Sequence, residues 1–396
     1  MKDRYDCIII GAGPAGSMAA LILAKNKHNV LLIEKHKEVG QPLCCAEAIS
    51  PKGISICGEV KPAWISSVIH KILLVSPSGK ELKFSYPNAG LILNRKLFDK
   101  ELALKAQSLG AELKVNTQAV GLMNNNKGEV CGIRVKENGK ELEYQAKVII
   151  AADGIESLVG RWAGLDNSLK LDEVDSAYQY LLKGDGIEED RIEFHLSTKL
   201  APGGYAWVFP KGKNLANVGL AVPPAFANPP KAEKAKELLD FFVMKRFRNF
   251  SVMGWVSGGI PAFSRKSQLV KDNLLFVGDA ARVVDSLSGA GIANALLSGK
   301  IAGLVASEYL KNGGAPLTYL KKYKEEFLKI KGRELRFYSF CRQIYLKMKD
   351  EDFEEVIDFL KLYLKQKELT ELNPLEVLKT ILKSNPKLLL LVRHLV

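Results

Sequence analysis

Six residues near the start of the chain have the types and spacing that bind a phosphate group. They form the run Gly11-Ala12-Gly13-Pro14-Ala15-Gly16, which is a G-x-G-x-x-G pattern. The first glycine of such a pattern allows a tight turn, the second lets the backbone approach a pyrophosphate, and the third lets a helix pack closely on a strand. Pro14 suits the first helical turn, where an amide hydrogen has no helical acceptor. The candidate binding residues are Gly11, Gly13, Ala15 and Gly16.

A carboxylate follows at the distance expected for a nucleotide ribose. Glu34 ends an apolar run that begins at Val30. A carboxylate at this place can accept hydrogen bonds from both hydroxyls of an adenosine ribose. Residues 6–10 and 30–34 are predicted strands and residues 14–27 a predicted helix, which makes one βαβ unit. The glycine pattern alone also fits a simple turn, but with the strands, the helix and Glu34 it predicts an adenine dinucleotide site.

Two later segments point to a flavin rather than a nicotinamide. Val277-Gly278-Asp279-Ala280-Ala281 follows a predicted strand over 274–277, and Asp279 is placed to hold a ribityl chain. Gly291 and Ile292 begin a predicted helix over 291–310, whose positive N-terminus would stabilise an anionic reduced flavin. A third segment, Ala152-Asp153-Gly154, also ends a strand. Taken alone, the Gly-Asp segment also fits an ordinary turn from strand to helix.

Together these segments resemble the superfamily of FAD-dependent hydroxylases and reductases. The resemblance implies that FAD is the cofactor. It assigns Asn94-Arg95-Lys96-Leu97-Phe98-Asp99, at the start of a helix predicted over 93–109, to a place where Arg95 reaches FAD phosphate or ribityl oxygens. It also lays the backbone of Ala119 and Val120 against the adenine. The alternative for Arg95 is an ordinary surface position on a helix.

The loop after the second strand narrows the resemblance to the geranylgeranyl reductase family. Residues 40–50 read GQPLCCAEAIS, which is similar to the family's P-x-x-C-[AG]-[EG]-[GA] loop beside the isoalloxazine ring. By its spacing from Pro42, Cys45 is the family cysteine and Cys44 is an additional one. The resemblance places Cys45, Ala46 and Ala48 at the cofactor and makes Cys45 the candidate catalytic residue. Many members have glycine where this chain has Ala48, and a pair of inert buried thiols is the alternative.

A second motif lies in the later half of the chain. Gly204-Tyr205-Ala206-Trp207-Val208-Phe209-Pro210 is similar to the family's Y-x-W-x-F-P motif. In a strand, Tyr205, Trp207 and Phe209 share one face. Such an aromatic wall would suit a long apolar substrate beside a flavin, and these three residues are the candidate substrate-binding residues. Core packing is the other explanation of the aromatic stripe.

The family resemblance implies reduction of isolated C=C bonds in geranylgeranyl chains, most closely those of digeranylgeranylglycerophospholipids on the way to archaeol in archaeal-type membrane lipid biosynthesis. Two other functions fit the FAD segments: an FAD-dependent monooxygenase of an aromatic or polyprenyl substrate, and a non-catalytic lipid-binding flavoprotein. No second G-x-G-x-x-G run provides a separate domain for NADPH. The electron donor is therefore either reduced ferredoxin or NADPH docked directly at the flavin.

Composition limits the class and the setting of the protein. The 396 residues are 47% hydrophobic and 26% charged, and 57 Lys plus Arg against 44 Asp plus Glu give a net charge of +13. The charge fits a lysine-rich surface, or attraction to an anionic membrane, a phospholipid or an acidic donor. No basic run or motif indicates nucleic acid. The six cysteines, whose spacing fits neither disulfides nor a metal site, are Cys7, Cys44, Cys45, Cys57, Cys131 and Cys341. A cytoplasmic setting follows, either free or peripheral on the cytoplasmic face of the membrane.

The predicted architecture is α/β, with a Rossmann-type FAD-binding domain interleaved with an antiparallel-sheet substrate domain, plus a C-terminal helical region. The domains are predicted at 1–66, 88–170 and 265–315 for FAD, 67–87 and 171–264 for the prenyl-chain sheet, and 316–396 for the helices. A hairpin is predicted over 72–86 around Ser78-Gly79, and a helix over 231–248 inside the second sheet. No apolar run reaches the length of a membrane span.

The C-terminal residues 385–396 contain a short leucine run between Lys387 and Arg393. Such a run can bury a few side chains in one membrane leaflet while the basic residues meet lipid phosphates. It can equally pack against the protein's own helices. The sequence leaves both readings open.

Overall fold

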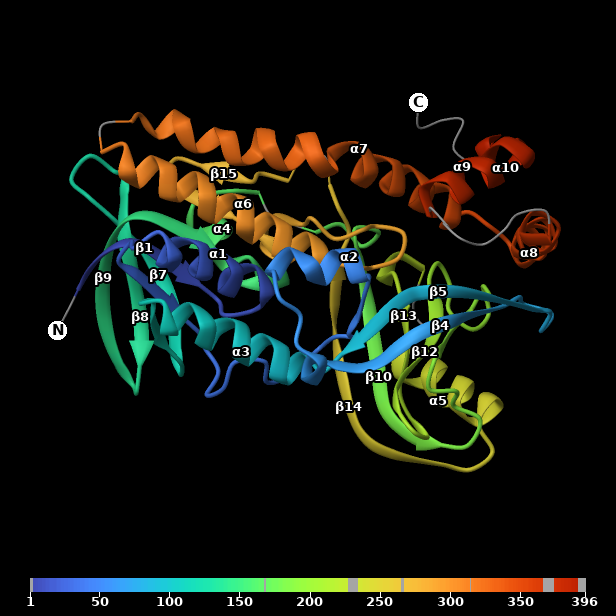
Figure 1. The fold of residues 1–396 in the computed structure, drawn as a ribbon. Coiled ribbons are helices and arrows are strands. Elements are labelled where there is room, and N and C mark those ends of the chain that lie inside the picture. The colour runs from blue at the N-terminus through green and yellow to red at the C-terminus, as the bar shows by residue number, and fades with distance from the viewer. Residues whose placement is uncertain are drawn as a thin grey trace.

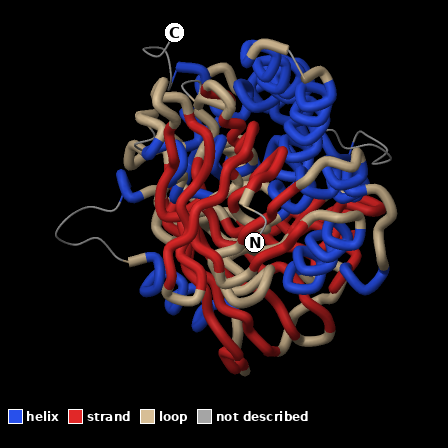
Figure 2. The backbone as a smooth tube through the Cα atoms, turned by 90° about the vertical axis from the view of Figure 1, so that its left-hand side faces the viewer, coloured by secondary structure: helices blue, strands red, loops and turns tan. Residues whose placement is uncertain are grey.

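The computed structural model describes residues 3–166, 169–226, 234–264, 267–313, 315–365 and 374–390. Within these residues two eight-stranded sheets lie side by side, and a band of helices runs along both (Figure 1). Seen from the side, the strands form two curved layers with the helices on their outer faces (Figure 2). This arrangement confirms the predicted mixed α/β fold.

The first sheet is mainly parallel at its centre, in the order β15-β16-β9-β1-β2-β6, with β8 pairing β9 and β7 pairing β8. The pairs β1–β2, β1–β9, β9–β16 and β2–β6 are all parallel. The central strands are continuous apolar runs because helices or loops cover both faces. The strands are β1 (Arg4–Ile10), β2 (Val30–Ile33), β6 (Glu112–Lys114), β7 (Thr117–Asn124), β8 (Val130–Glu137), β9 (Lys140–Ala151), β15 (Val270–Lys271) and β16 (Leu274–Phe276).

Small residues let two helices pack closely beside this sheet. A β-carbon on Gly299 would lie 2.1 Å from the carbonyl oxygen of Ala15, so the two helices touch through their backbones there. The helices on this part of the chain are α1 (Pro14–Lys25), α2 (Pro51–Ile54), α3 (Arg95–Ser108), α4 (Leu158–Trp162) and α6 (Ile292–Lys311). Asn94 caps α3 as the sequence suggests, because its side chain accepts a hydrogen bond from the amide of Leu97.

The second sheet has the order β14-β10-β13-β12-β11-β4-β5-β3. Its strands are antiparallel except for one pair, since β11 runs parallel to β4 where the early hairpin joins the later strands. The strands are β3 (Ala48–Ile49), β4 (Ile65–Val75), β5 (Glu81–Leu93), β10 (Val174–Gly184), β11 (Arg191–His195), β12 (Tyr205–Gly212), β13 (Leu215–Val222) and β14 (Phe250–Pro261). Helix α5 (Ala235–Arg246) packs its apolar side on one face of this sheet.

The predicted hairpin is present but longer than the sequence indicated. β4 begins at Ile65 and β5 ends at Leu93, so strand pairing extends past the predicted borders at residues 66 and 87. The helix predicted over 231–248 is α5, and its predicted residues 231–233 lie outside the described residues. The division of the chain into three domains stays a prediction.

The C-terminal part is helical: α7 (Lys322–Tyr345), α8 (Asp350–Lys365), α9 (Pro374–Ser384) and α10 (Lys387–Leu390). Their apolar residues form a cluster with Leu74, Leu82 and Phe84 of the β4–β5 hairpin. Buried Arg342 of α7 joins three segments, because it pairs with Asp175 at 2.6 Å and donates to the carbonyl oxygens of Asp172 and Ser286. The helical part is therefore fastened both to the second sheet and to the loop before α6.

Candidate functional site

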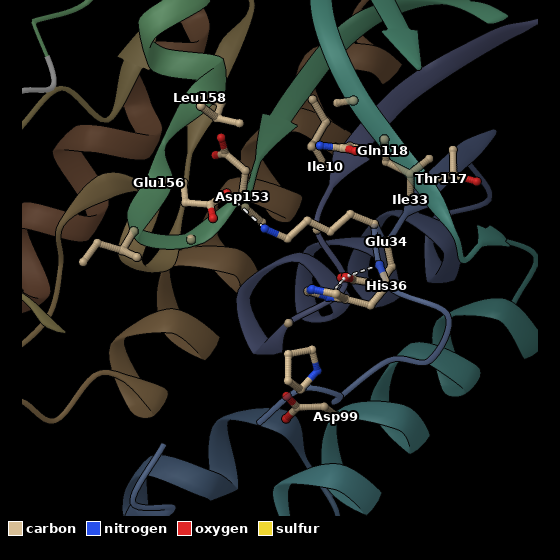
Figure 3. A pocket seen from close by; sticks show the side chains of 18 of the residues that line it. Ile10, Ile33, Glu34, His36, Asp99, Thr117, Gln118, Asp153, Glu156 and Leu158 are labelled. Carbon is tan, nitrogen blue, oxygen red and sulfur yellow. Dashed lines mark hydrogen bonds and ion pairs between the residues drawn. The ribbon is translucent and has the colours of Figure 1, made fainter. Parts of the chain in front are cut away.

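A cavity of about 330 Å³ opens at the carboxyl ends of β1 and β2. Figure 3 shows side chains from several segments pointing into it, among them Glu34, Thr117, Gln118 and Asp153. Loops that follow β1, β2 and β9 form its walls, together with the start of α3 and of β7. The residues of its lining that the sequence predicted are Gly11, Gly13, Glu34, Arg95, Ala119 and Asp153.

The glycine turn brings backbone, and no side chain, to the cavity. Gly11 has a φ of +101°, which L side chains rarely adopt, and a β-carbon there would lie 2.3 Å from the carbonyl oxygen of Ala152. A β-carbon on Gly16 would lie 1.9 Å from the carbonyl oxygen of Gly11. Helix α1 begins directly after Gly13, so its free amides face the cavity. This is the geometry that a pyrophosphate requires.

Glu34 lies at the cavity as predicted, and local backbone holds its carboxylate. Oε2 accepts a hydrogen bond from the amide of Ala12 at 3.0 Å, and Oε1 accepts one from the amide of His36 at 3.0 Å. The His36 ring nitrogen Nδ1 lies 2.7 Å from the same Oε1 (Figure 3). A carboxylate fixed in this way can still accept hydrogen bonds from ribose hydroxyls, because each oxygen has two lone pairs.

Asp153 leaves a buried acceptor without a partner. Its Oδ2 accepts a hydrogen bond from the amide of Val159 at 2.9 Å, but Oδ1 is buried with no hydrogen-bond partner among the described residues. Burial raises the pKa of this carboxyl, partly offset by the backbone hydrogen bonds. Buried polar atoms are normally satisfied, so Oδ1 fits a donor supplied by a bound molecule. With the glycine turn and Glu34, the site fits an FAD molecule.

Arg95 begins α3 and also lines the cavity. Its guanidinium makes two hydrogen bonds to the Asp99 carboxylate, at 2.8 Å and 2.6 Å, and both side chains are largely buried. Although burial acts against it, the Asp99 charge raises the pKa of Arg95 above its ordinary value. The bidentate pair therefore fixes the guanidinium in place at the cavity, which Asp99 also lines, and a guanidinium held in this way suits a phosphate or ribityl oxygen.

Asp279 and the start of α6 come together beside this region. A β-carbon on Gly291 would lie 3.4 Å from Asp279 Oδ1, and Ile292 follows as the first residue of α6. Burial raises the pKa of Asp279, while the nearby charge of Arg95 acts to lower it. These residues lie outside the cavity lining described above, as do Ala15, Gly16, Val120, Cys45, Ala46 and Ala48. Their assignment to the cofactor stays a prediction.

The two neighbouring cysteines have different surroundings. Cys44 is exposed and lines the cavity, and the position of a β-carbon on Gly258 lies 3.5 Å from its β-carbon. Cys45 is more enclosed: its sulfur accepts a hydrogen bond from the amide of Glu47 at 3.2 Å. Burial raises the pKa of the Cys45 thiol, although Arg95 acts to lower it. Burial therefore favours the neutral form of the Cys45 thiol.

A buried polar network that the sequence did not reveal fixes the cysteine loop. Glu47 is 3% exposed, and its carboxylate pairs with Lys211 at 2.6 Å. The same carboxylate accepts hydrogen bonds from Asn217 Nδ2 at 2.8 Å and from the amide of Arg95 at 2.9 Å. Gln179 donates to the carbonyl oxygen of Cys45 at 3.1 Å. Lys211 follows the aromatic motif directly. Nothing in the sequence spacing indicates that Glu47, Lys211 and Asn217 come together.

The aromatic residues of β12 share one face, as predicted. The ring centroids of Tyr205 and Trp207 lie 5.9 Å apart, and those of Trp207 and Phe209 lie 6.2 Å apart. Trp207 and Phe209 are 5% and 6% exposed, and they cluster with Ala46 and Ala48 of the cysteine loop. Trp207 Nε1 donates to Gln179 Oε1 at 3.1 Å, so one glutamine joins this wall to Cys45. Tyr205 donates to the carbonyl oxygen of Ser288, in the loop before α6.

Neither a cluster of metal-binding side chains nor a membrane-spanning helix occurs among the described residues. No group of three or more His, Cys, Asp or Glu side chains comes together there in a way that could hold a metal ion. None of the described helices combines the length and the apolar character that crossing a bilayer needs.

Known sequences resemble this chain along most of its length. Residues 173–260 match the model of the geranylgeranyl reductase catalytic domain, and residues 5–192 match that of pyridine nucleotide-disulphide oxidoreductases. A digeranylgeranylglycerophospholipid reductase from Methanocella arvoryzae is 42% identical over 330 residues, which cover 82% of this chain and 83% of that protein. A second reductase of that name, from Methanococcoides burtonii, is 39% identical over 82% of this chain and 80% of its own.

Solved structures show the same likeness. A geranylgeranyl bacteriochlorophyll reductase-like protein from Thermoplasma acidophilum aligns over 100% of both chains, with a TM-score of 0.92 and 30% identity. A flavin-dependent brominase shares the fold alone, with a TM-score of 0.68 and 19% identity over 90% of this chain and 93% of its own.

Proposed function

The chain belongs to the geranylgeranyl reductase family of FAD-dependent oxidoreductases, and from that membership we propose that it reduces isolated C=C bonds in the geranylgeranyl chains of digeranylgeranylglycerophospholipids. The reaction would belong to archaeal-type membrane lipid biosynthesis. One observation of the structure carries the proposal: Gln179 joins Cys45 to the aromatic wall through two hydrogen bonds. The backbone of the cysteine loop is therefore held against the buried aromatic residues, whose rings would suit an isoprenoid chain.

An isolated alkene is a poor hydride acceptor, because it has no carbonyl to stabilise a developing charge. Bound reduced FAD would supply the hydride. The chain's own residues would exclude water and place the proton. The aromatic wall and the alanines of the cysteine loop make an apolar environment. Cys45, whose pKa is raised by burial, keeps its proton and is our candidate for proton delivery or for shaping the pocket beside the reacting bond.

The proposed cofactor contacts follow the predicted residues. Gly11, Gly13, Ala15 and Gly16 would meet the pyrophosphate, Glu34 the ribose, and Ala119 and Val120 the adenine. Arg95 and Asp279 would hold the phosphate and ribityl oxygens, with Gly291 and Ile292 at the pyrimidine edge. We also propose the predicted division of the chain into an FAD-binding domain, a substrate sheet domain and a C-terminal helical domain.

The electron donor is proposed to be reduced ferredoxin or NADPH. The net charge of +13 supports an acidic protein donor, because complementary charge speeds and orients association. Single-turnover rates at rising salt would separate the two, since reduction by a ferredoxin should slow more steeply than reduction by NADPH.

The first experiment is turnover by the purified FAD-bound protein. Chemically reduced enzyme is mixed anaerobically with a detergent-dispersed digeranylgeranyl phospholipid, and the product is analysed by mass spectrometry. We expect a mass gain of two hydrogens for each bond reduced. Oxygen insertion in air would indicate a monooxygenase instead. An unchanged lipid that nevertheless binds would indicate a lipid-binding flavoprotein.

A further inference from the structure

One edge of the second sheet exposes large apolar side chains to solvent. On β14, Val252, Met253 and Trp255 are 46%, 61% and 62% exposed. On α5, which precedes this strand, Phe241 and Met244 are 58% and 68% exposed. Large apolar side chains at such exposure are unremarkable singly, but a group on two elements that follow one another in the chain can mark an interaction site. We call β14 residues 250–255 and the outer side of α5 the docking face.

The docking face lies at the end of the sheet order, where β14 pairs only with β10 among the described strands. Trp255 stacks on Tyr178 of β10, with ring centroids 5.5 Å apart and planes within 9° of parallel. Tryptophan and tyrosine are favoured where an apolar medium meets water, because one end of each ring system is apolar and the other polar. Their pairing on an exposed edge suits a membrane surface better than the interior of a protein.

Basic side chains surround these apolar ones. Lys183 and Arg248 line an open groove together with Phe250, and Lys245 lies three residues before Arg248. Lys213 is exposed on the turn between β12 and β13, next to Asn214 of the same groove. None of these four forms an ion pair within the described part of the chain. The groove also holds the acidic Asp185, which accepts a hydrogen bond from Asn249 at 3.1 Å.

The same strand leads from the docking face to the site. Gly258 of β14 lies beside Cys44, which lines the cavity. Trp255 and Gly258 are separated by about 10 Å of extended strand at about 3.3 Å per residue. A lipid held at the docking face would therefore stand close to the cysteine loop.

In the C-terminal tail, the other candidate for membrane contact, some described residues contact the protein while Leu389 and Leu390 are 40% and 61% exposed. Leu388 is 2% exposed within the helical cluster, and Lys387 pairs with Glu355 at 2.5 Å. Residues 391–396, with Arg393, lie outside the described residues. More of the exposed large apolar side chains lie on β14 and α5, which carry six of them, than on the described part of the tail.

We propose that the docking face binds the surface of an anionic lipid bilayer, with Trp255 and Met253 entering the interface and Lys245 and Arg248 meeting lipid phosphates. The inference deepens the proposed function, because it assumes that the substrate is a membrane lipid. A basic amphipathic surface gains from both apolar burial and attraction to anionic headgroups, so binding should weaken with salt.

The test is co-sedimentation of the full FAD-bound chain with vesicles of equal parts phosphatidylglycerol and phosphatidylcholine. We expect binding that falls as salt rises, and binding roughly tenfold weaker for the triple variant Val252→Ser, Met253→Ser, Trp255→Ser. The matched control replaces Leu171, Ile330 and Leu362 by serine, at similar exposures of 62%, 57% and 62%. A charge variant, Lys245→Gln with Arg248→Gln, is compared with Lys127→Gln and Lys140→Gln.

All variants should keep their flavin absorbance and melting temperature, and should turn over detergent-dispersed substrate like the parent protein. Equal vesicle binding by the docking-face variant and its control would overturn the proposal. So would a parent protein that does not bind vesicles, or a docking-face variant whose only change is the loss of a dimer in light scattering, because β14 would then pair with a second copy. Failure of the proposed function is separate: detergent-dispersed lipid would stay unreduced whatever the vesicles show.

Discussion

The cavity at the end of β1 and the cysteine loop beside it are built in different ways. Backbone makes the cavity: Gly11 and Gly16 are positions where a β-carbon would collide with carbonyl oxygens, and local amides hold Glu34. Side chains from distant segments hold the cysteine loop, since Glu47 contacts Arg95, Lys211 and Asn217. The first kind of site requires residues at a recognisable spacing in the sequence, and the second kind does not.

The two kinds of construction should fail differently when a side chain is changed. Removing a group from a buried charge network leaves its partners uncompensated, and this costs stability in the whole fold. Removing a side chain that faces the cofactor should cost binding or turnover while the fold survives. Variants of each kind can therefore test this difference.

The largest effect is expected for Glu47→Gln. The substitution leaves the buried ammonium of Lys211 without its carboxylate, and breaking such a pair typically costs about 3–5 kcal/mol of the free energy of unfolding. Denaturant unfolding of the FAD-bound protein measures it. Glu355→Gln is the control, because its exposed pair with Lys387 should leave the unfolding midpoint unchanged. Equal midpoints for both variants would remove the structural role of Glu47.

A second buried carboxylate, Glu193 of β11, predicts a dependence of stability on pH. Although burial acts to raise it, hydrogen bonds from His195 and Arg246 hold the pKa of Glu193 well below its usual range. The stability this lowered pKa contributes is present above the unfolded pKa of about 4.3 and is lost as pH falls toward the folded value. Glu193→Gln should cost about 3 kcal/mol at pH 7, with the difference shrinking below about pH 4. A difference that grows with acid would contradict this account.

Asp279→Ala tests the flavin end of the cofactor site. The side chain lies at the start of α6 beside Gly291, where we propose that it holds ribityl oxygens. We expect FAD affinity to fall roughly tenfold, which corresponds to about 1.4 kcal/mol, while the apoprotein stays folded. Flavin absorbance after gel filtration measures occupancy, and Asp272→Ala, at an exposed position, serves as the control. Full retention of FAD in both variants would remove this assignment.

The smallest expected effect is the difference in activity between variants of the two neighbouring cysteines. Cys45→Ser should lose activity severalfold more than Cys44→Ser, because Cys45 is the enclosed one that contacts the Glu47 amide. Both variants should keep FAD. Anaerobic turnover of a geranylgeranyl lipid measures the difference. A larger loss at Cys44, which lines the cavity, would place the functional cysteine one position earlier.

Much of the fold could be predicted because local signals agree with it. The glycine turn, the Asn94 cap of α3 and the hairpin turn at Gly79 are short-range features whose residue types fix their geometry. The ends of β5 could not be predicted in the same way. Pro87-Asn88-Ala89-Gly90 has the composition of a turn, but the strand continues through it with a shift of register against Ile69 and Lys71.

The residues of the site also fall into two groups, those that local motifs predicted and those that only the fold brings together. Glu34, Arg95 and Asp153 were predicted from motifs and line one cavity. Gln179 and Asn217 were missed, because each is an unexceptional polar residue until the fold brings segments more than a hundred residues apart into contact. Glu47 stood in the cysteine-loop motif, but its buried partners were missed. Lys211 directly follows the aromatic motif, but the motif does not indicate that Lys211 pairs with the buried Glu47.

Arg342 has a consequence for how such chains can be recombined. Its guanidinium contacts Asp172, Asp175 and Ser286 at once, so α7 is matched to two other parts of the chain. A chimera that took its C-terminal helices from one relative and its sheets from another would have to keep this arginine and its acceptors together. In such a chimera the helical part would have to be exchanged together with the sheets, because a crossover point placed before α7 would separate the arginine from its acceptors.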